Sequence, residues 1–162
     1  MSQPELKIEQ DGSKRWYLHG KCHREDGPAI ERPNGEKFWY LNGEQHREDG
    51  PAVEHPDGSK VWYLHDKRHR EGGPAIEYPD GEKWWYLNSK VHREGGPAVE
   101  YSNGVREWYL NDKLHREDGP AIEWPDGTKE WYLNGKSVSW KEVFKNAKTK
   151  EQELNIIIHA LG

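Results

Sequence analysis

The sequence predicts a mainly β protein, built as a tandem array of β-hairpin repeats and closed by a short C-terminal helical cap. Three observations predict this fold. Several motifs recur with one fixed period of 23 residues. Each period holds two turn signals separated by short β-forming runs. After residue 136 the period stops and helix-capping signals begin. The predicted domains are a repeat array over residues 1–136, with about five and a half repeats, and a helical cap over residues 137–162.

Three motifs keep the 23-residue period without insertion or deletion. The Trp-Tyr-Leu triplet begins at Trp16, Trp39, Trp62, Trp85, Trp108 and Trp131. The His-Arg-Glu triplet begins at His23, His46, His69, His92 and His115. Gly-Pro-Ala begins at Gly27, Gly50, Gly73, Gly96 and Gly119. A period this regular is typical of stacked structural repeats.

Residues 74–96 show how one repeat is organised. Residues 75–78 form a short predicted strand, and Pro79-Asp80-Gly81 supplies a type I turn with a glycine bulge. Residues 83–87, Lys-Trp-Trp-Tyr-Leu, form the aromatic returning strand. A second tight turn follows, which reads Asn-Gly in two other repeats, a strong hairpin signal. The next proline interrupts ladder pairing and begins the following repeat.

The three-residue loop determines which residues face each other across the hairpin. It predicts five pairs of opposite charge: Glu31 with Lys37, Glu54 with Lys60, Glu77 with Lys83, Glu100 with Arg106, and Glu123 with Lys129. Each pair contributes ~0.2–1 kcal/mol, and their main effect is to fix the register.

This register separates two faces of the sheet. The framework face carries residue types that barely change between repeats, as in Ala75, Glu77, Lys83, Trp85 and Leu87. The opposite, varied face has two positions whose residue type varies freely between repeats. The first position reads Arg32, His55, Tyr78, Tyr101 and Trp124. The second position reads Phe38, Val61, Trp84, Glu107 and Glu130.

The two ends of the array differ from its middle. Residues 6–12 resemble half a repeat, which leaves an edge strand near the N-terminus. Capping boxes at residues 139–142 and 149–152 predict a helix to about residue 147 and another that ends near Gly162. We expect one apolar face of the second helix to cover the last hairpin, and His159 beside it to lie at the solvent edge or to act as a cap. That face consists of Leu154, Ile157, Ile158 and Leu161.

Composition and charge disfavour several functional classes. The net charge of −5 argues against nucleic acid and anionic membranes as partners. No apolar run approaches the length of a membrane-spanning helix, and residues 1–10 contain no apolar signal core. Cys22 is the only cysteine, so no internal disulfide can form, and a cytoplasmic location is expected.

The repeated His-Arg-Glu triplet does not predict a metal or catalytic site. Two strands per repeat separate equivalent histidines by ~10 Å, whereas zinc binds its ligands at about 2.0–2.1 Å. A catalytic group is needed once, and five copies are typical of a framework. We therefore expect no enzyme activity, no cofactor and no metal.

The repeat resembles the MORN repeat. The likeness covers roughly residues 8–136 and is carried by Lys-x-His, Gly-x-Ala, Pro-Asp-Gly and an aromatic strand that ends in Asn-Gly-Lys, as in residues 113–136. The chain departs from that family in its Trp-Tyr-Leu triplet and in the fixed Arg-Glu after His. The resemblance implies an elongated, single-layer, twisted antiparallel meander with scaffold or binding work, and lipid binding is proposed for some members. A bacterial antitoxin family built of related aromatic Asn-Gly repeats is also similar.

The varied face and the central arginines supply the candidate binding residues. Tyr78, Trp84 and Tyr101 cluster near the middle of the array by register, and the Glu-Asp-Gly segment becomes Glu-Gly-Gly at residues 71–73 and 94–96, which removes two negative charges. Aromatic residues and arginine are favoured in interface hot spots. The candidate partner-binding residues are Tyr78, Trp84, Tyr101, Arg68, Arg70, Arg93, Phe38 and Trp124.

Two hypotheses follow from these residues. The first is a non-catalytic protein-binding repeat module, such as an inhibitor or antitoxin that blocks a partner protein. The second is a small-anion or nucleotide-sequestering protein that uses Arg70, Arg93 and neighbouring aromatic residues. Drift among tolerant surface positions explains the same variation equally well, and the sequence leaves the partner and the oligomeric state open.

Overall fold

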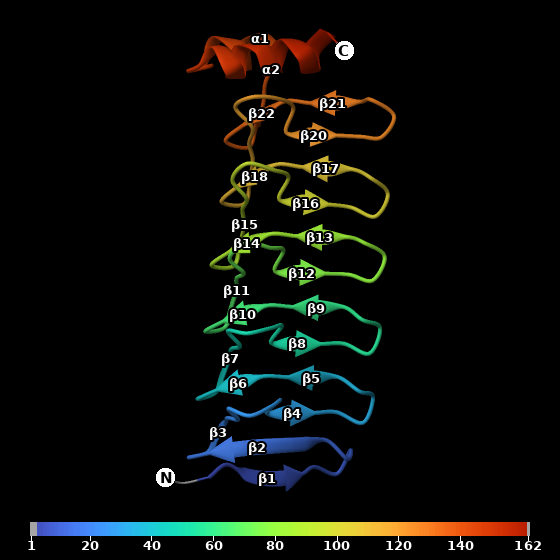
Figure 1. Ribbon diagram of the computed structural model, residues 1–162, viewed down its shortest axis with the longest axis vertical. Helices are drawn as coiled ribbons and strands as arrows, with labels where there is room; N and C mark the ends of the chain where they lie inside the picture. The colour runs from blue at the N-terminus through green and yellow to red at the C-terminus, as the bar shows by residue number, and fades with distance from the viewer. Residues whose placement is uncertain (1–2, 162) are drawn as a thin grey trace. The chain divides into compact units, whose positions relative to one another are not determined.

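A computed structural model describes residues 3–161, which group into two compact units, Met1–Gly81 and Glu82–Gly162. Each unit is mainly β, with antiparallel strand pairs that follow one another along the chain, and the second unit ends in two short helices (Figure 1). The predicted fold class is confirmed. The predicted boundary at residue 136 falls inside a strand, β23 (Lys136–Ser137), and the helical cap groups with the repeats of the second unit.

The main sheet of each unit is an antiparallel meander of short strands. In the first unit the order is β1 (Glu5–Ile8), β2 (Lys14–Leu18), β4 (Ile30–Glu31), β5 (Lys37–Phe38), β8 (Val53–Glu54), β9 (Lys60–Val61) and β12 (Ile76–Glu77). In the second unit it is β13 (Lys83–Trp84), β16 (Val99–Glu100), β17 (Arg106–Glu107), β20 (Ile122–Glu123) and β21 (Lys129–Glu130). The predicted N-terminal edge strand is β1, whose residues are all exposed.

A tight side hairpin follows each Trp-Tyr-Leu triplet. In the first repeat, β3 (Lys21–Cys22) pairs with the end of β2. The later side hairpins form separate two-stranded ladders. They are β6 (Tyr40–Leu41) with β7 (Glu44–Gln45), β10 (Tyr63–Leu64) with β11 (Lys67–Arg68), β14 (Tyr86–Leu87) with β15 (Lys90–Val91), β18 (Tyr109–Leu110) with β19 (Lys113–Leu114), and β22 (Tyr132–Leu133) with β23 (Lys136–Ser137).

The sequence predicts one continuous aromatic strand over residues 83–87. In the structure this strand is divided at Trp85 into β13 and β14. The N–H of Trp85 donates to the carbonyl of Ala98 at 2.8 Å in the main sheet, whereas its carbonyl accepts from the N–H of His92 at 3.1 Å in the side hairpin. One residue thus bonds in two different directions, and the chain turns out of the main sheet at that point.

Both predicted turn types are confirmed. In the first complete loop, Asn34 Oδ1 accepts from the N–H of Glu36 at 3.1 Å, and Gly35 has a φ of +92°, as a glycine bulge requires. At the side hairpin of the same repeat, Asn42 and Gly43 have φ values of +53° and +90°, the signature of a type I′ turn.

The predicted register is confirmed for the charge pairs that lie within one unit. Glu31 faces Lys37 and Glu54 faces Lys60 in the first unit, while Glu100 faces Arg106 and Glu123 faces Lys129 in the second. The core is thin and follows the same register. The framework alanines are fully buried, and the Ile or Val that follows each of them on the varied face is at most 8% exposed. Burial of small side chains on one face leaves room for the tryptophans beside them.

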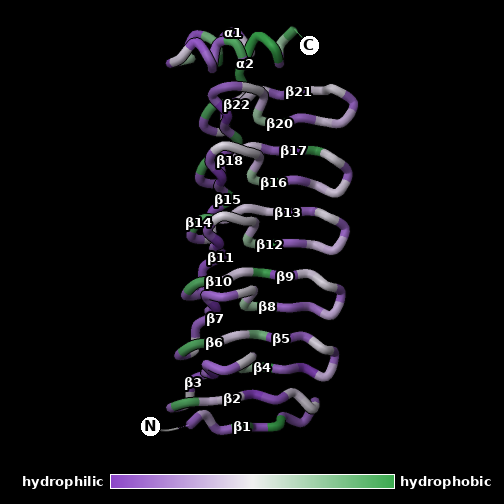
Figure 2. Tube along the Cα trace, viewed as in Figure 1, coloured by the Kyte–Doolittle hydropathy of each residue, from purple (hydrophilic) through white to green (hydrophobic). Residues whose placement is uncertain are grey.

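The two predicted helices are present, with predicted caps. Helix α1 (Trp140–Lys145) begins after Ser139, whose hydroxyl accepts from the N–H of Glu142 at 3.3 Å, and α2 (Lys150–Leu161) begins after Thr149. Figure 2 shows that apolar residues gather along α2.

The expected packing face of α2 is wrong. Leu154, Ile158 and Leu161 are 58%, 57% and 77% exposed, whereas Ile156 is fully buried. The less exposed residues of α2 include Gln152, Ile156, His159 and Ala160, which follow a helical stripe rotated from the predicted one. Four apolar residues in the run from 154 to 158 fit several helical faces, so their spacing did not select the buried one.

Candidate functional site

A stack of arginine on tryptophan recurs on the framework face. In each repeat the arginine of His-Arg-Glu lies over the ring of the Trp-Tyr-Leu tryptophan eight positions earlier, with the guanidinium carbon 3.9–4.3 Å from the ring centroid. The pairs are Arg24 on Trp16, Arg47 on Trp39, Arg70 on Trp62, Arg93 on Trp85 and Arg116 on Trp108. In the sequence, the only sign of these pairs is the constant spacing of eight residues between tryptophan and arginine. The spacing alone does not predict the contact, because the two side chains meet only when the side hairpin folds the chain back.

Hydrogen bonds hold each of these guanidinium groups at one corner. Nη1 of Arg93 donates to the carbonyl of Pro97 at 2.9 Å and to Glu100 at 3.2 Å, and Nη1 of Arg70 donates to Pro74 at 3.1 Å and to Glu77 at 2.6 Å. The framework glutamate therefore binds an arginine as well as facing a lysine across the strands.

The glycine of each Gly-Pro-Ala motif lies against the other side of the guanidinium. A Cβ atom at Gly119 would stand 2.6 Å from the guanidinium carbon of Arg116, and at Gly50 it would stand 2.8 Å from that of Arg47. Both distances are far inside van der Waals contact, so the stack requires glycine at these positions.

Replacing Gly119 by alanine is expected to displace Arg116 from Trp108 and to lower the free energy of unfolding by about 1–3 kcal/mol, because the added methyl group overpacks the stack. Urea denaturation measures the change. As a control, Gly127→Ala tests a glycine whose added Cβ meets no atom within 4 Å and whose cost comes only from its φ of +88°. An unchanged Arg116 Nε–H resonance in Gly119→Ala would contradict the prediction.

Three of the His-Arg-Glu histidines, His23, His46 and His115, accept a hydrogen bond from the backbone of the next side hairpin, whereas Nδ1 of His92 is buried without a hydrogen-bond partner among the described residues. Nδ1 of His23 accepts from the N–H of Asn42 at 3.0 Å, and Nδ1 of His115 accepts from that of Asn134 at 3.0 Å. His23 is buried, and its Nε2 lies 3.6 Å from Glu25. The triplet thus has a structural use in each unit. Among residues 3–161, no group of three or more histidine, cysteine, aspartate or glutamate side chains could hold a metal ion.

The arginines differ in what binds their Nε–H. In the Glu-Asp-Gly repeats this group donates to the aspartate two positions later, from Arg24 to Asp26 at 2.8 Å, from Arg47 to Asp49 at 2.9 Å and from Arg116 to Asp118 at 2.8 Å. The hydrogen bond from the arginine holds the pKa of Asp26 and of Asp49 below the ordinary value.

Arg70 and Arg93 have glycine in place of that aspartate. In residues 3–161, all hydrogen bonds of these two guanidinium groups use Nη1, and none uses Nε or Nη2. Their side chains are 33% and 32% exposed, compared with 22% for Arg24 and 13% for Arg116. Arg70 and Arg93, both predicted as binding residues, therefore stabilise the repeat through Nη1 and leave the edge formed by Nε and Nη2 without a protein acceptor among the described residues.

The varied face of the second unit carries an aromatic cluster. Trp84 meets Tyr101 edge to face, with ring centroids 5.8 Å apart, and stacks on Tyr86 at 6.3 Å. The indole N–H of Trp84 donates to Glu82 at 2.7 Å, and the Tyr101 hydroxyl donates to Glu107 at 3.2 Å. Burial, with the charge of Glu107 as a second cause, raises the pKa of Tyr101 to about 12, so this hydroxyl stays a donor at neutral pH.

The remaining candidates occupy separate places. Phe38 lies on the varied face of the first unit, between Arg32 at 4.7 Å and the ring of His55 at 6.5 Å. Tyr78 belongs to the first unit and is 41% exposed. Arg68 lies in β11 opposite Tyr63, and Trp124 is half-buried beside the loop that follows β20.

Shallow grooves lie between successive Arg-Glu loops within each unit. One groove, of about 640 Å³, extends from Arg47 to Arg70 over Trp62 and Leu64. Another, of about 560 Å³, extends from Arg93 to Arg116 over Trp108 and Leu110. Each groove therefore has an apolar floor and a guanidinium group at either end.

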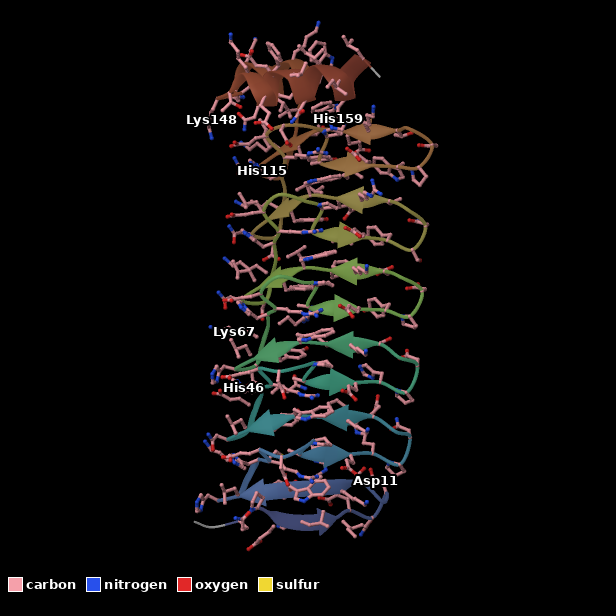
Figure 3. All side chains as sticks on the ribbon, viewed as in Figure 1. Asp11, His46, Lys67, His115, Lys148 and His159 are labelled. Carbon is pink, nitrogen blue, oxygen red and sulfur yellow. The ribbon has the colours of Figure 1, made fainter. Side chains whose placement is uncertain are left out.

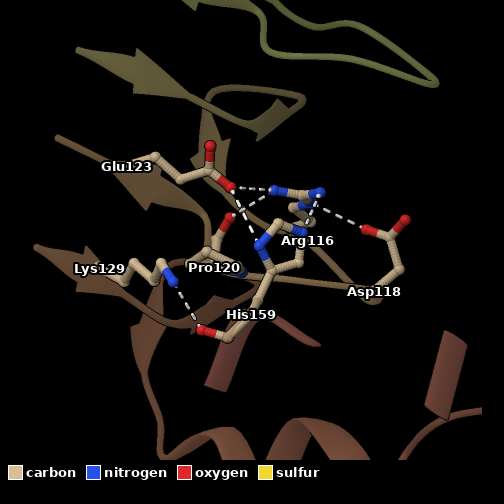
Figure 4. A network of polar contacts seen from close by, with 6 residues as sticks. All are labelled: Arg116, Asp118, Pro120, Glu123, Lys129 and His159. Carbon is tan, nitrogen blue, oxygen red and sulfur yellow. Dashed lines mark hydrogen bonds and ion pairs between the residues drawn. The ribbon is translucent and has the colours of Figure 1, made fainter. Parts of the chain in front are cut away.

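The helical cap attaches to the array through the last arginine stack (Figure 4). His159 of α2 places Nε2 at 3.4 Å from Nη2 of Arg116 and Nδ1 at 3.7 Å from Glu123, and its carbonyl accepts from Lys129 at 2.9 Å. In Figure 3, His159 lies between α2 and the hairpin beneath it. His159 lies at the solvent edge as expected, with its side chain 29% exposed, and in addition it contacts Arg116, which the sequence did not predict.

This docking is expected to weaken in mild acid. Burial, and next the charge of Arg116, hold the pKa of His159 below its ordinary value, while Glu123 acts in the opposite direction and Lys129 and Asp118 contribute less. The folded state therefore binds fewer protons than the unfolded state, and stability is lost as pH falls below ~6.5. Hydrogen exchange of the α2 amides at about pH 7.5 and about pH 5.5 measures the effect. In His159→Gln the pH dependence should disappear, and its persistence would contradict this assignment.

Comparisons with known proteins assign no family. No protein-family model matches the chain, and no curated protein matches it significantly. Among residues 3–161, no helix has the length and apolar character needed to cross a bilayer.

Proposed function

We propose that the protein is a non-catalytic binding module that recognises a partner protein with the varied face of its repeats. The observation that supports this most is the aromatic cluster that two varied positions, Trp84 and Tyr101, form with the recurrent Tyr86. Its rings are held by each other and by Glu82 and Glu107, so little side-chain freedom is lost when a partner docks. Rigid aromatic side chains are typical hot-spot residues.

The contacts of the recurrent His-Arg-Glu triplets also support this proposal. In every His-Arg-Glu triplet the arginine contacts the tryptophan of its own repeat and the proline and glutamate that begin the next, as Arg93 contacts Trp85, Pro97 and Glu100. These contacts account for the recurrence of the triplet without a reaction. The differences between repeats are then what a partner can read. An inhibitor or antitoxin that blocks its target would use such a surface, in keeping with the MORN-like and antitoxin-like pattern of the sequence.

The test uses the triple variant Tyr78→Ala, Trp84→Ala and Tyr101→Ala in affinity capture from the native cell. A partner captured by the unmodified chain is purified, and its affinity is measured by calorimetry. We expect the triple variant to bind it about 30-fold or more weakly, as loss of a hot spot implies. The control, Arg32→Ala with His55→Ala, changes two varied positions equivalent to Tyr78 and Tyr101 and should bind normally. Equal affinity of the triple variant and the control would overturn the proposal.

A second candidate function is the binding of a small anion, and the open edges of Arg70 and Arg93 favour it. A tight ligand raises the melting temperature by mass action. A panel of nucleotides and other small anions therefore separates this candidate from the first. No change in melting temperature with any member would count against it.

A further inference from the structure

The repeats contain an internal comparison that identifies a ligand class for Arg70 and Arg93. Five guanidinium groups stack on tryptophan in the same way, but only three of them receive an aspartate carboxylate on Nε. In those three, Nε and the carboxylate oxygen lie 2.8–2.9 Å apart, the usual distance for a charge-assisted hydrogen bond. These three repeats therefore show that the Nε–H donates to a carboxylate oxygen in this setting.

At Arg70 and Arg93 the carboxylate is missing, but the stack on tryptophan and the hydrogen bonds of Nη1 remain. The guanidinium carbon lies 4.0 Å from the Trp62 ring centroid and 3.9 Å from that of Trp85, and Nη1 stays bonded to proline and glutamate. The donor edge is thus oriented before any ligand arrives, which lowers the entropic cost of binding.

The donor edge is partly exposed to solvent, since the side chains of Arg70 and Arg93 are 33% and 32% exposed. A Cβ atom at Gly72 or Gly95 would meet no atom within 4 Å, and both glycines have positive φ values, +74° and +76°. The Asp26, Asp49 and Asp118 positions do not have positive φ. The Gly-Gly loops thus take a backbone conformation that removes the internal carboxylate and disfavours any side chain that could replace it.

We propose that Arg70 and Arg93 each form a binding position for an external carboxylate, which accepts from Nε–H and Nη2–H as a bidentate pair. The inference gives the chemistry of the anion candidate above and does not depend on the aromatic cluster. At Arg93 the carboxylate would lie at one end of the groove over Trp108 and Leu110, so an acidic side chain next to an apolar one suits that position best. The negative net charge of the chain and the nearby Glu94 keep the affinity for free anions low.

The experiment follows the arginine Nε–H resonances of the full chain by NMR while sodium acetate is added, with sodium chloride at equal ionic strength as the reference. We expect saturable shifts at Arg70 and Arg93 and none at Arg24, Arg47 or Arg116. Equal responses from all five arginines would overturn the proposal.

Two variants test the internal comparison directly. Asp49→Gly should open the edge of Arg47 and make its resonance respond to acetate. Gly95→Asp should close the edge of Arg93 and weaken its acetate binding by about tenfold or more. Because the positive φ of Gly95 opposes aspartate, the Asp49→Gly result decides the matter: a silent Arg47 resonance in that variant would sink the idea.

Further titrations identify the ligand source. A titration with inorganic phosphate in place of acetate tests whether the ligand is a carboxylate. Tighter binding of phosphate than of acetate at both arginines would contradict the proposal. A capped peptide with a leucine next to a single glutamate tests the source. Tighter binding of the peptide than of acetate at Arg93 supports a protein side chain, and equal binding supports a free carboxylate. Loss of partner binding in the aromatic triple variant with the acetate response intact would reject the protein-binding proposal alone.

Discussion

Replacing Trp62 by alanine is expected to destabilise the first unit by about 3–5 kcal/mol. Trp62 is only 9% exposed, so its indole is part of the packed core. The indole also supports the guanidinium of Arg70 at 4.0 Å. Alanine therefore leaves a cavity and an arginine that no longer rests on a ring. Denaturation in urea, followed by circular dichroism, measures the loss.

The matched control for this variant is Trp124→Ala. Trp124 belongs to the varied face, is half-buried, and its backbone N–H still donates to Thr128 at 3.0 Å after the change. We expect a loss of no more than about 1 kcal/mol there, as for most substitutions away from a packed core. If Trp62→Ala and Trp124→Ala lower the free energy of unfolding by the same amount, the framework face and the varied face do not differ in their contribution to stability.

Replacing Ile156 by aspartate is expected to detach α2 and to cost about 3 kcal/mol or more, because a charge would be buried without a partner. Ile156 is fully buried, and α2 lies against α1, whose Val143 is 1% exposed. The variant should lose the protection of α2 amides from hydrogen exchange, and with it the contact between His159 and Arg116.

Ile158→Asp is the control, since it makes the same chemical change two residues away. Ile158 is 57% exposed, so the charge stays in water and the expected change is within about 0.5 kcal/mol. The sequence alone favours the opposite ranking, because Ile158 belongs to the predicted apolar face. A larger loss in Ile158→Asp than in Ile156→Asp would restore that prediction and contradict the structure.

Most local features could be predicted because they depend on neighbours in sequence. Gly35 and Gly43 adopt positive φ where the Pro-Asn-Gly and Asn-Gly patterns require it, and Ser139 caps its helix. The Glu31–Lys37 register follows from the length of a single loop. The same holds for the aromatic cluster, since Trp84 and Tyr101 meet on the face that the register predicts.

Contacts between segments that are distant in the register could not be predicted. The stack of Arg93 on Trp85 depends on the division of the strand at that tryptophan, and only the folded side hairpin brings the two side chains together. The buried side of α2 depends on where Arg116 offers a partner for His159, a choice that apolar spacing within the helix does not contain.

The sequence by itself determined the period, the turns, the register and the two faces, because each of these rests on backbone preferences and on the alternation of side chains along a strand. Only the tertiary structure decided which hydrogen-bonding groups of the arginines have a partner within the protein and which do not. It gave the five framework arginines a tryptophan each and left Arg70 and Arg93 with an unfilled edge. The physical reason is that a hydrogen-bonding edge becomes free or occupied only when every neighbour that could reach it has its place in the fold.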